Sequence, residues 1–529
     1  MSARLRIFFQ THTLLRQTLK WSVPALLIGA VLRLMLMSYS PYAYWGSDSK
    51  SYFSFANTLL GEGYISLDEK RRYLYPICMV PVTALPGAPL KWLAWLQHLV
   101  GLCSLLPLAY VVRKTMHLWK WWIIPVTILY TAIPLFLWYE HELLGEVLFF
   151  SALMWTFAGW VAWVSEKDTA RSHRLFWWFF TPLAVFLLTK PSGRFLVPGI
   201  VCGLIAIRAW RVLDRRHWIA LAVLAVITLT VGSKKQGAWL LYVASFPLTQ
   251  FDSPKHADYK AELRSYAEPY LHDLDTYYLH DKRAPKGQST PFELLGSPSE
   301  ENAPPLWAAL DKDLVKKRSL YMDLAIEGIK ARPLDFAYLG AQRLIASANL
   351  SEFGENRFSS DYYPKKIEAL YEDASKLVTA GKRTSLPMAF GLPKNSPLPS
   401  FADFRQRLAP SPDCWAERTI ITWASAFHAV SDVVSMPRAT KGADPSERSI
   451  TRARPTLLGC WLLVSLALTF TRWRTLGVWT IVTLGYLAGV FFVSLVSARY
   501  LAPAWIIFLP MLVLPLDIAL SALLRRRKA

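Results

Sequence analysis

Residues 73–85 read YLYPICMVPVTAL, and the placement of this short apolar stretch decides the fold predicted for the whole chain. A transmembrane helix needs about 20 apolar residues. This stretch is shorter, contains Pro76 and Pro81, and is followed by Pro86. Proline lacks the backbone N–H that a helix interior uses. If residues 73–85 crossed the membrane, every later loop would change sides, so this stretch sets which loops share a face.

The composition and the longer apolar runs predict a membrane protein. Of the 529 residues, 53% are hydrophobic, 14% are aromatic and only 18% are charged, which is unusual for a soluble domain. Helices are expected, because hydrocarbon offers the backbone no other hydrogen-bond partner. We therefore predict an all-α polytopic membrane protein with spans at residues 21–38, 90–112, 118–139, 143–164, 174–189, 195–210, 217–233, 455–471, 475–497 and 500–522.

The basic residues predict the orientation. With residues 73–85 placed at the outer interface, most basic clusters in short loops fall on one side, which is the positive-inside pattern. Both ends of the chain are then cytoplasmic, in a cytoplasmic (inner) membrane crossed several times. The formal charge of +21 is then assigned to contacts with anionic lipids and not to nucleic acid. The clusters lie at residues 4–20, 113–120, 167–174, 208–216, 472–474 and 525–528.

The chain divides into three predicted parts. Residues 1–233 form a module of seven spans with outer interface segments at 49–60 and 73–85, and residues 455–529 form three spans and a basic cytoplasmic tail. Residues 234–454, rich in Lys, Asp, Glu, Pro and Ser, form an extracytoplasmic (periplasmic), mostly helical domain. The five cysteines predict no disulfide framework. No Cys and His spacing predicts a zinc site, and no glycine-rich phosphate loop occurs.

Two acidic residues on the predicted outer face are candidate catalytic groups. Asp48 follows the first run and precedes apolar residues at helical spacing over 49–60, which predict a short amphipathic helix on the membrane. Glu146 lies about one turn inside an otherwise apolar run, where a carboxylate is costly and indicates function. The structural alternatives are that Asp48 or Ser47 caps its helix and that Glu146 only pairs with a neighbouring cation.

Basic and aromatic residues on the same predicted face are candidate substrate-binding groups. Lys190 and Arg194 flank the turn between the runs at 174–189 and 195–210, and two such cations suit a phosphate. Anchoring at the lipid headgroups is the alternative for all the basic members. The full set is Arg71, Arg72, Tyr75, Lys190, Arg194, Arg499 and Tyr500, with Arg33 as a further cation near the outer end of the first run.

Four motifs on this face form a recognisable set. They are the aspartate after the first run, an Arg-x-x-Tyr-Pro motif at 72–76, the carboxylate near the start of the run at 143–164, and an Arg-Tyr-x-x-Pro motif at 499–503. Together they resemble the GT-C glycosyltransferases, in particular the branch with the bacterial protein mannosyltransferases and the lipid A aminoarabinose transferase. The resemblance covers residues 1–233 and the turn at Arg499, and it does not extend to the outer domain.

The resemblance implies an inverting hexosyl- or pentosyltransferase that moves a sugar from a polyprenyl-phosphate carrier to an acceptor. The acceptor is a glycolipid, glycan or protein on the outer face, as in the synthesis of a cell envelope glycan. Asp48 resembles the family's general base, and Glu146 resembles the acidic position that orients the acceptor or supports a metal. Lys190, Arg194 and Arg499 would stabilise the leaving phosphate.

Two departures from the family pattern argue against a bound metal. Ser49 stands where many relatives carry a second acidic residue, and the acidic residue that the aminoarabinose transferase carries in its second interface helix has no obvious counterpart here. The cofactor is therefore left open, with a divalent cation as the candidate.

Two other functions remain open on the sequence. An O-antigen ligase or polymerase also uses lipid-linked sugars at the outer face, and such an enzyme would depend on loop histidines such as His272 or His280. A transporter or flippase is the alternative from another class, although few ionisable residues lie in the middle of the predicted spans.

Overall fold

The fold was determined as a computed structural model, and the residues that it describes are almost entirely helical. Apart from an isolated bridge between Tyr44 and Glu142, their regular secondary structure consists of helices. The described residues are 3–44, 49, 52, 59, 72, 74–85, 89–230, 240–273, 318–347, 358, 368, 371–372, 375, 400–403, 414–434, 457–493 and 498–526.

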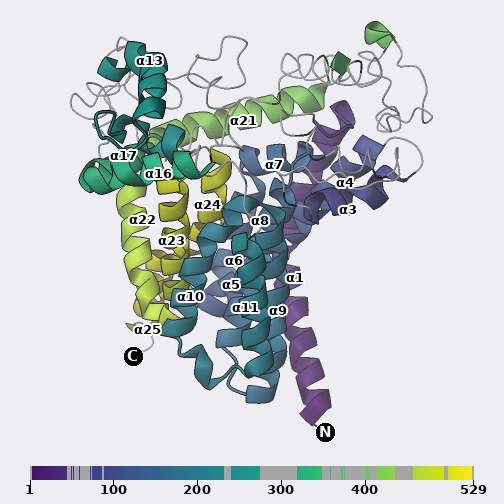
Figure 1. The fold of residues 1–529 in the computed structure, drawn as a ribbon. Helices are drawn as coiled ribbons and strands as arrows, with labels where there is room; N and C mark the ends of the chain where they lie inside the picture. The colour runs from purple at the N-terminus through teal and green to yellow at the C-terminus, as the bar shows by residue number, and fades with distance from the viewer. Residues whose placement is uncertain are drawn as a thin grey trace.

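The front part of the chain forms a helical bundle, shown in purple to teal in Figure 1. Its α-helices are α1 (Ala3–Tyr39), α3 (Leu74–Thr83), α4 (Pro89–Cys103), α5 (Leu105–Thr115), α6 (Trp119–Thr131), α7 (Pro134–His141), α8 (Glu146–Val164), α9 (Thr169–Thr189), α10 (Leu196–Ala206) and α11 (Arg215–Thr230). Two short 3-10 helices, η1 (Pro191–Phe195) and η2 (Ala209–Arg211), flank α10.

The remaining helices form a second bundle portion and a layer across one end. The layer contains η3 (Leu240–Ser245), η4 (Phe246–Leu248), α13 (Ala257–Asp273), α16 (Arg318–Ala331), α17 (Pro333–Ser347) and α21 (Trp415–Val434). The bundle portion contains α22 (Leu457–Leu468), η8 (Thr469–Arg472), η9 (Trp473–Gly477), α23 (Val478–Val493), α24 (Ala498–Leu512) and α25 (Leu514–Arg526).

Several helices can cross a membrane, as the sequence predicts. Four stretches are long and apolar enough: Arg16–Tyr39, Leu90–Thr115, Glu146–Val164 and Leu501–Arg526. The bent pair α6 and α7 makes a fifth if the two count as one span. The predicted runs at 174–189, 195–210, 217–233, 455–471 and 475–497 coincide with α9, α10, α11, α22 and α23. The chain is therefore a membrane protein with several spans, whereas the predicted total of ten remains a prediction.

The break between α6 and α7 determines where the candidate site begins. The two helix axes differ by 53°, and Pro134 is the first residue of α7. Proline cannot continue a helix, because it lacks the N–H and its ring clashes with the preceding turn. Every residue of α7 is buried. The bend thus directs a fully buried short helix, ending in Glu140 and His141, into the interior.

Helices α8 and α9 form an antiparallel hairpin at the centre of the bundle. Gly159 allows their close approach, because a Cβ there would lie 2.7 Å from Phe179 Cα and 2.5 Å from the Trp178 carbonyl oxygen. Small residues at such contacts are typical of membrane helix pairs. The start of α8 therefore lies beside the end of α9, which brings Glu146 to Lys190.

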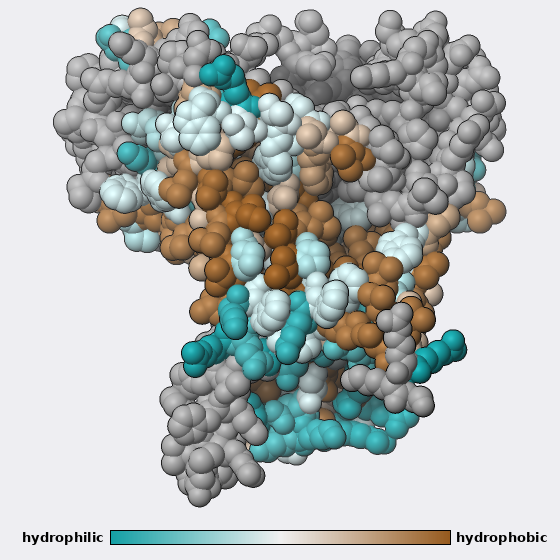
Figure 2. Space-filling model, turned by 180° about the vertical axis from the view of Figure 1, so that it is seen from behind, coloured by the Kyte–Doolittle hydropathy of each residue, from teal (hydrophilic) through white to brown (hydrophobic). Residues whose placement is uncertain are grey.

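The outer surface of the bundle is apolar. Large hydrophobic side chains on α1, such as Leu27 and Val31, are 62% and 53% exposed, and they suit contact with lipid. On the face that Figure 2 shows, hydrophobic residues form a band across the waist of the molecule, and hydrophilic residues gather below it. In Figure 1 both chain ends lie at one end of the bundle, and α13, α16, α17 and α21 lie at the other.

Helix α3, formed by most of residues 73–85, is short. Its ten residues correspond to about 15 Å at 1.5 Å per residue, about half of the bilayer's hydrocarbon thickness of roughly 30 Å. It packs against α4 and α9, and Figure 1 shows it beside α4 near α7. Its length agrees with the prediction that this stretch does not cross the membrane by itself.

Candidate functional site

The site is centred on a buried ion pair between two of the predicted residues. Lys190 Nζ lies 2.6 Å from Glu146 Oε1, and the two side chains are 4% and 0% exposed. Glu146 is the first residue of α8, where the positive end of the helix dipole favours a carboxylate. Lys190 Nζ also lies 5.7 Å from the centre of the Phe149 ring. The structural alternative raised for Glu146, pairing with a cation, is therefore what the structure contains, and the cation is itself a predicted site residue.

Tyr75 lies next to this pair. A Cβ on Gly145 would lie 3.5 Å from Tyr75 Cβ and 3.5 Å from Thr189 Cγ2, so Tyr75 and Thr189 both lie beside Gly145, the residue that precedes Glu146. The phenol donates a hydrogen bond to Gln97 Oε1 at 2.5 Å. Burial raises the pKa of Tyr75 well above its ordinary value, and the neighbouring Tyr52, Glu146 and Glu142 raise it further. Tyr75 therefore stays protonated and acts as a hydrogen-bond donor.

Arg72 is placed three residues before Tyr75 in the chain and is also buried, at 3% exposed. Its Nη2 donates a hydrogen bond of 2.8 Å to the Thr228 carbonyl oxygen near the end of α11. A buried guanidinium at this point is expensive unless it is well partnered. The structure thus brings Tyr75, Glu146 and Lys190 into one buried region, whereas the printed contact of Arg72 is to α11.

Residues on both sides of Asp48 are fixed to the loop that leads into α8. The Tyr44 N–H donates to the His141 carbonyl oxygen at 2.7 Å, and the Leu143 N–H donates to the Tyr44 carbonyl oxygen at 2.8 Å. Ser49 Oγ donates to the Leu143 carbonyl oxygen at 3.0 Å, and Ser49 is buried. Asp48 itself lies outside the described residues. Ser49, the departure from the family pattern, thus makes a structural hydrogen bond.

The other predicted residues are only partly described. Arg194 is half-buried in η1, with its guanidinium carbon 5.1 Å from the centre of the Phe195 ring. Arg499 and Tyr500 lie in the first turn of α24, which packs against α8, and their side chains lie outside the described residues. Arg71 and His280 lie outside them as well, as does the His272 side chain. The predicted amphipathic helix at 49–60 is described only at 49, 52 and 59, which are helical.

A buried polar network beside the site joins residues that the sequence did not group. Arg33 donates to Glu140 through Nε at 2.7 Å and Nη2 at 2.5 Å. His98 Nδ1 lies 3.1 Å from Glu140 Oε2, and His98 Nε2 lies 3.0 Å from His141 Nδ1. His141 Nε2 lies 3.3 Å from Ser40 Oγ. Ionisable residues within apolar runs are a functional signal. That signal marks Arg33 and His98, but it does not reveal their partners.

Gln97 connects this network to Tyr75. Its amide Nε2 donates to the carbonyl oxygens of Glu140 at 2.9 Å and Glu142 at 2.8 Å, while its Oε1 accepts from Tyr75. The Glu142 carboxylate accepts from Trp138 Nε1 at 2.9 Å. One amide therefore holds the loop at 140–142 and the phenol of Tyr75 in a fixed relation.

Comparisons with known proteins give structural similarity alone. No protein-family model matches the chain, and no curated protein matches it by sequence. Its structure is similar over most of its length to GT-C glycosyltransferases, as the sequence motifs predicted. One is the oligosaccharyltransferase AglB from Archaeoglobus fulgidus, solved with an inhibitory peptide and a dolichol-phosphate, with a TM-score of 0.39 and 14% identity over 96% of this chain. Another is ArnT from Cupriavidus metallidurans bound to undecaprenyl phosphate, with a TM-score of 0.33 and 15% identity over 91% of this chain.

The lengths of these proteins differ from that of this chain. The chain spans about half of AglB, 51% of its length, and 78% of ArnT. Similarity at this level does not specify an activity, a substrate or a partner.

Proposed function

We propose that this chain is a membrane glycosyltransferase of the GT-C type, which transfers a sugar from a polyprenyl-phosphate carrier to an extracytoplasmic acceptor. The observation that carries the proposal is that residues from separate motifs meet at the start of α8. Glu146 pairs with Lys190, Tyr75 lies against Gly145, and Ser49, which follows Asp48, hydrogen-bonds to Leu143. A purely anchoring role for these residues would not require them to converge.

In the proposed reaction Asp48 is the general base. The acceptor hydroxyl gives its proton to the Asp48 carboxylate while its oxygen attacks the anomeric carbon of the donor sugar. The bond between that carbon and the phosphate oxygen breaks, and the electron pair leaves with the phosphate. Attack from the face opposite the phosphate inverts the configuration at the anomeric carbon.

The cations of the site stabilise the charge that develops on the leaving phosphate. Lys190 is the best placed of the described candidates, because its ammonium is buried and held by Glu146. Fixed charges in a dry site act more strongly than in water and need no reorganisation during the reaction. Arg194 and Arg499 are assigned the same role, and Arg71, Arg72, Tyr75 and Tyr500 are assigned to donor binding.

Glu146 is assigned to positioning of Lys190. Its carboxylate lies against the ammonium, and a lysine side chain is otherwise flexible. The resemblance also implies that Glu146 orients the acceptor or supports a divalent cation, and parallel assays with a chelator test the latter role.

The proposed organisation places the reaction away from the cytoplasm. Residues 1–233 are the catalytic module, residues 234–454 form the outer domain, and residues 455–529 add spans and the basic tail. The site lies toward the end of the bundle where α13, α16, α17 and α21 are found, opposite both chain ends. With both ends cytoplasmic in the inner membrane, the acceptor is a glycolipid, glycan or protein that is reached from the periplasmic side.

One observation favours a second candidate, a proton-coupled transporter. Arg33, Glu140, His98 and His141 form a continuous buried chain across α1, α4 and α7, and buried ionisable chains occur in proton relays. Glycosyl transfer remains the better supported function, because Gln97, next to His98, holds the backbone of the loop at 140–142 beside Tyr75.

The activity is tested by incubating the purified full-length protein with a panel of polyprenyl-phosphate sugars and analysing lipid and product by mass spectrometry. The proposal expects one donor to be consumed, with release of polyprenyl phosphate, and parallel reactions with a chelator report metal dependence. Consumption of none of the donors, combined with proton-dependent uptake into proteoliposomes, would instead establish the transporter.

A further inference from the structure

A second cluster of ionisable side chains lies far from the candidate site. His173 belongs to the first part of α9, whereas Lys190 follows its last residue. At 1.5 Å per residue, the helix places the two about 25 Å apart. Asp214 and His217 lie at the start of α11, which packs against α9. The cluster therefore occupies the opposite end of the α8 and α9 hairpin from Glu146.

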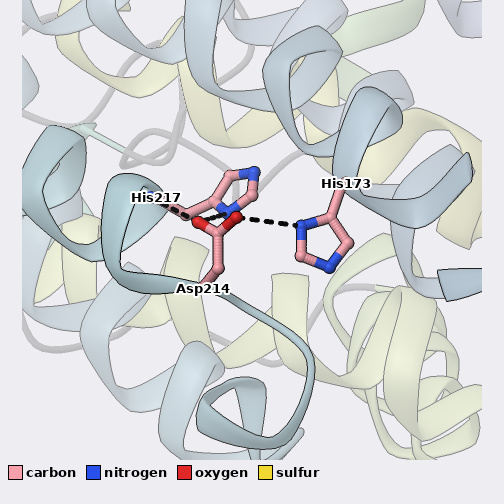
Figure 3. A group of neighbouring side chains, drawn as sticks. All are labelled: His173, Asp214 and His217. Carbon is pink, nitrogen blue, oxygen red and sulfur yellow. Dashed lines mark hydrogen bonds and ion pairs between the residues drawn. The ribbon is translucent and has the colours of Figure 1, made fainter. Parts of the chain in front are cut away.

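The ligating atoms of this cluster converge. Figure 3 shows the carboxylate of Asp214 between the rings of His217 and His173. Asp214 Oδ1 lies 2.6 Å from His217 Nδ1, and Asp214 Oδ2 lies 3.5 Å from His173 Nδ1. One ligand atom from each residue lies within 4.8 Å of the other two. The ring centres of the two histidines are 4.9 Å apart.

The local fold explains why Asp214 and His217 face each other. Asp214 Oδ1 accepts hydrogen bonds from the N–H groups of Arg216 at 3.0 Å and His217 at 3.2 Å, which is the pattern of a helix N-cap. A residue three positions later returns to the same face of the helix. The cap therefore places the His217 ring beside the carboxylate of Asp214.

His217 is the most informative member of the cluster. Its side chain is 3% exposed, and its ring lies against Phe176, with ring centres 4.5 Å apart. Its Nδ1 lies beside the Asp214 carboxylate, whereas its Nε2 has no hydrogen-bond partner among the described residues. Buried polar atoms usually find such partners, so the imidazole has hydrogen-bonding capacity left for a further group.

We propose that His173, Asp214 and His217 bind a divalent transition metal ion, with Zn²⁺ as the best match. Two imidazoles and one carboxylate are typical zinc ligands, at about 2.0–2.2 Å from the metal. Neighbouring ligand atoms in a tetrahedron of that size lie about 3.3 Å apart, close to the 3.5 Å between Asp214 and His173. The contact of 2.6 Å between Asp214 and His217 lengthens when the metal separates the two groups.

Access and charge are compatible with this site. The Asp214 side chain is 49% exposed, which gives an ion a path from solvent. The adjacent Arg215 and Arg216 are exposed, so solvent and salt screen their repulsion of a cation. Three protein ligands leave one tetrahedral position for water or a further ligand.

Bound zinc would connect the start of α9 to the start of α11. Ligand spacing does not reveal this site, because His173 in α9 and Asp214 before α11 lie far apart in the chain. The site is independent of the proposed sugar transfer, since none of its residues belongs to the candidate active site.

The proposal is tested by zinc titration of the full-length protein in detergent after removal of metal with EDTA. A chromophoric chelator competes for Zn²⁺, and the bound metal is counted by mass spectrometry. We expect one Zn²⁺ per chain. We also expect D214N and H217Q each to weaken binding by at least about 10-fold, the lower end of what loss of even an indirect partner of a metal ligand causes. D214N separates the two roles of Asp214, because asparagine also caps helices but lacks the carboxylate that would bind the metal.

The matched control is H117Q, since His117 is exposed and should leave zinc binding unchanged. If a ligand variant fails to fold, two measurements on the wild-type protein test the proposal instead. Zn²⁺ must raise its melting temperature more than the same concentration of Mg²⁺, and Co²⁺ must give the absorption bands of a tetrahedral site. Absence of stoichiometric zinc in the wild type, or unchanged zinc affinity in folded D214N and H217Q proteins, overturns the proposal.

Discussion

Arg33 and Glu140 form a two-pronged ion pair in the interior, with Nε to Oε2 at 2.7 Å and Nη2 to Oε1 at 2.5 Å. The two side chains are 4% and 3% exposed. The pair joins α1 to the end of α7, and the next residues form the loop to which Tyr44 and Ser49 bind. The position of residues 141–143, to which the residues on both sides of Asp48 bind, therefore depends on the ion pair between Arg33 and Glu140.

Breaking this pair from one side should destabilise the protein strongly. Removal of one partner from a buried ion pair leaves an uncompensated charge and costs about 3–5 kcal/mol. We expect R33M and E140M to lower the melting temperature in detergent more than the double variant R33M/E140M, in which no buried charge is left alone. If the double variant lowers the melting temperature by the sum of the two single effects, Arg33 and Glu140 do not stabilise each other.

Lys190 should contribute to the rate of transfer and not only to folding. Loss of one preorganised group that stabilises developing charge typically lowers kcat by about 10²–10³, and we expect K190Q to lie in this range. E146Q should lower kcat in the same direction, because Lys190 loses the carboxylate that holds it.

The matched control for Lys190 is K167Q, which removes an exposed lysine from the other end of the same hairpin. Initial rates at saturating donor, measured on protein with an unchanged gel-filtration profile, make the comparison. If K190Q transfers sugar at the wild-type rate, Lys190 takes no part in the reaction.

The close approach of α8 and α9 should be sensitive to side-chain size at Gly159. A Cβ there would meet Phe179 Cα at 2.7 Å, and overpacking of this kind costs about 1–3 kcal/mol. G159A should therefore lower the melting temperature. G485A is the control, because the nearest atom to a Cβ at Gly485 would be Gly199 Cα at 3.7 Å, an ordinary contact. Equal melting temperatures for both variants would contradict this packing.

A charge cluster in the layer across the end of the bundle should give a pH-dependent contribution to stability. Lys260 Nζ, which is 0% exposed, lies 2.8 Å from Glu327 Oε2, and Ser253 also donates to Glu327. Burial raises the pKa of Glu327, but the Lys260 and Ser253 hydrogen bonds and the charge of Lys260 lower it more, so the net pKa lies below its ordinary value.

For a carboxyl group with a lowered pKa, the stability gain is present above the unfolded-state pKa, about 4.3 for glutamate, and is lost as the pH falls through the folded-state value. E327Q should therefore lower the melting temperature at pH 7 and have little effect at a pH below the folded-state pKa. A stability difference between wild type and E327Q that does not change with pH would contradict this assignment.

The sequence predicted the helices better than their breaks. The described part of each predicted run is mostly helical, because long apolar stretches leave the backbone no alternative in hydrocarbon. The run at 118–139 is divided at Pro134 into α6 and α7, and the run at 90–112 is divided at Ser104 into α4 and α5. Pro134 is visible in the sequence, but the 53° bend depends on how α7 packs in the interior.

The sequence identified individual residues of the site but not the contacts between them. Glu146 stood out as a carboxylate within an apolar run, and Lys190 stood out as a cation on the opposite face to most others. Their pairing across 44 positions depends on the α8 and α9 hairpin. The Arg33 and Glu140 pair spans 107 positions, and the role of Gln97 comes from two backbone carbonyl groups that no side-chain pattern reveals.

The most direct test of the proposed function is transfer by D48N, with D252N as the matched control, since Asp252 has an exposed side chain. Single-turnover transfer from the donor identified by the panel is measured for both variants and the wild type, after zinc content and melting temperature are shown to be equal. The account predicts that D48N binds the donor but transfers no sugar, while D252N matches the wild type. Wild-type transfer by D48N would contradict the account, because the reaction would then have another base.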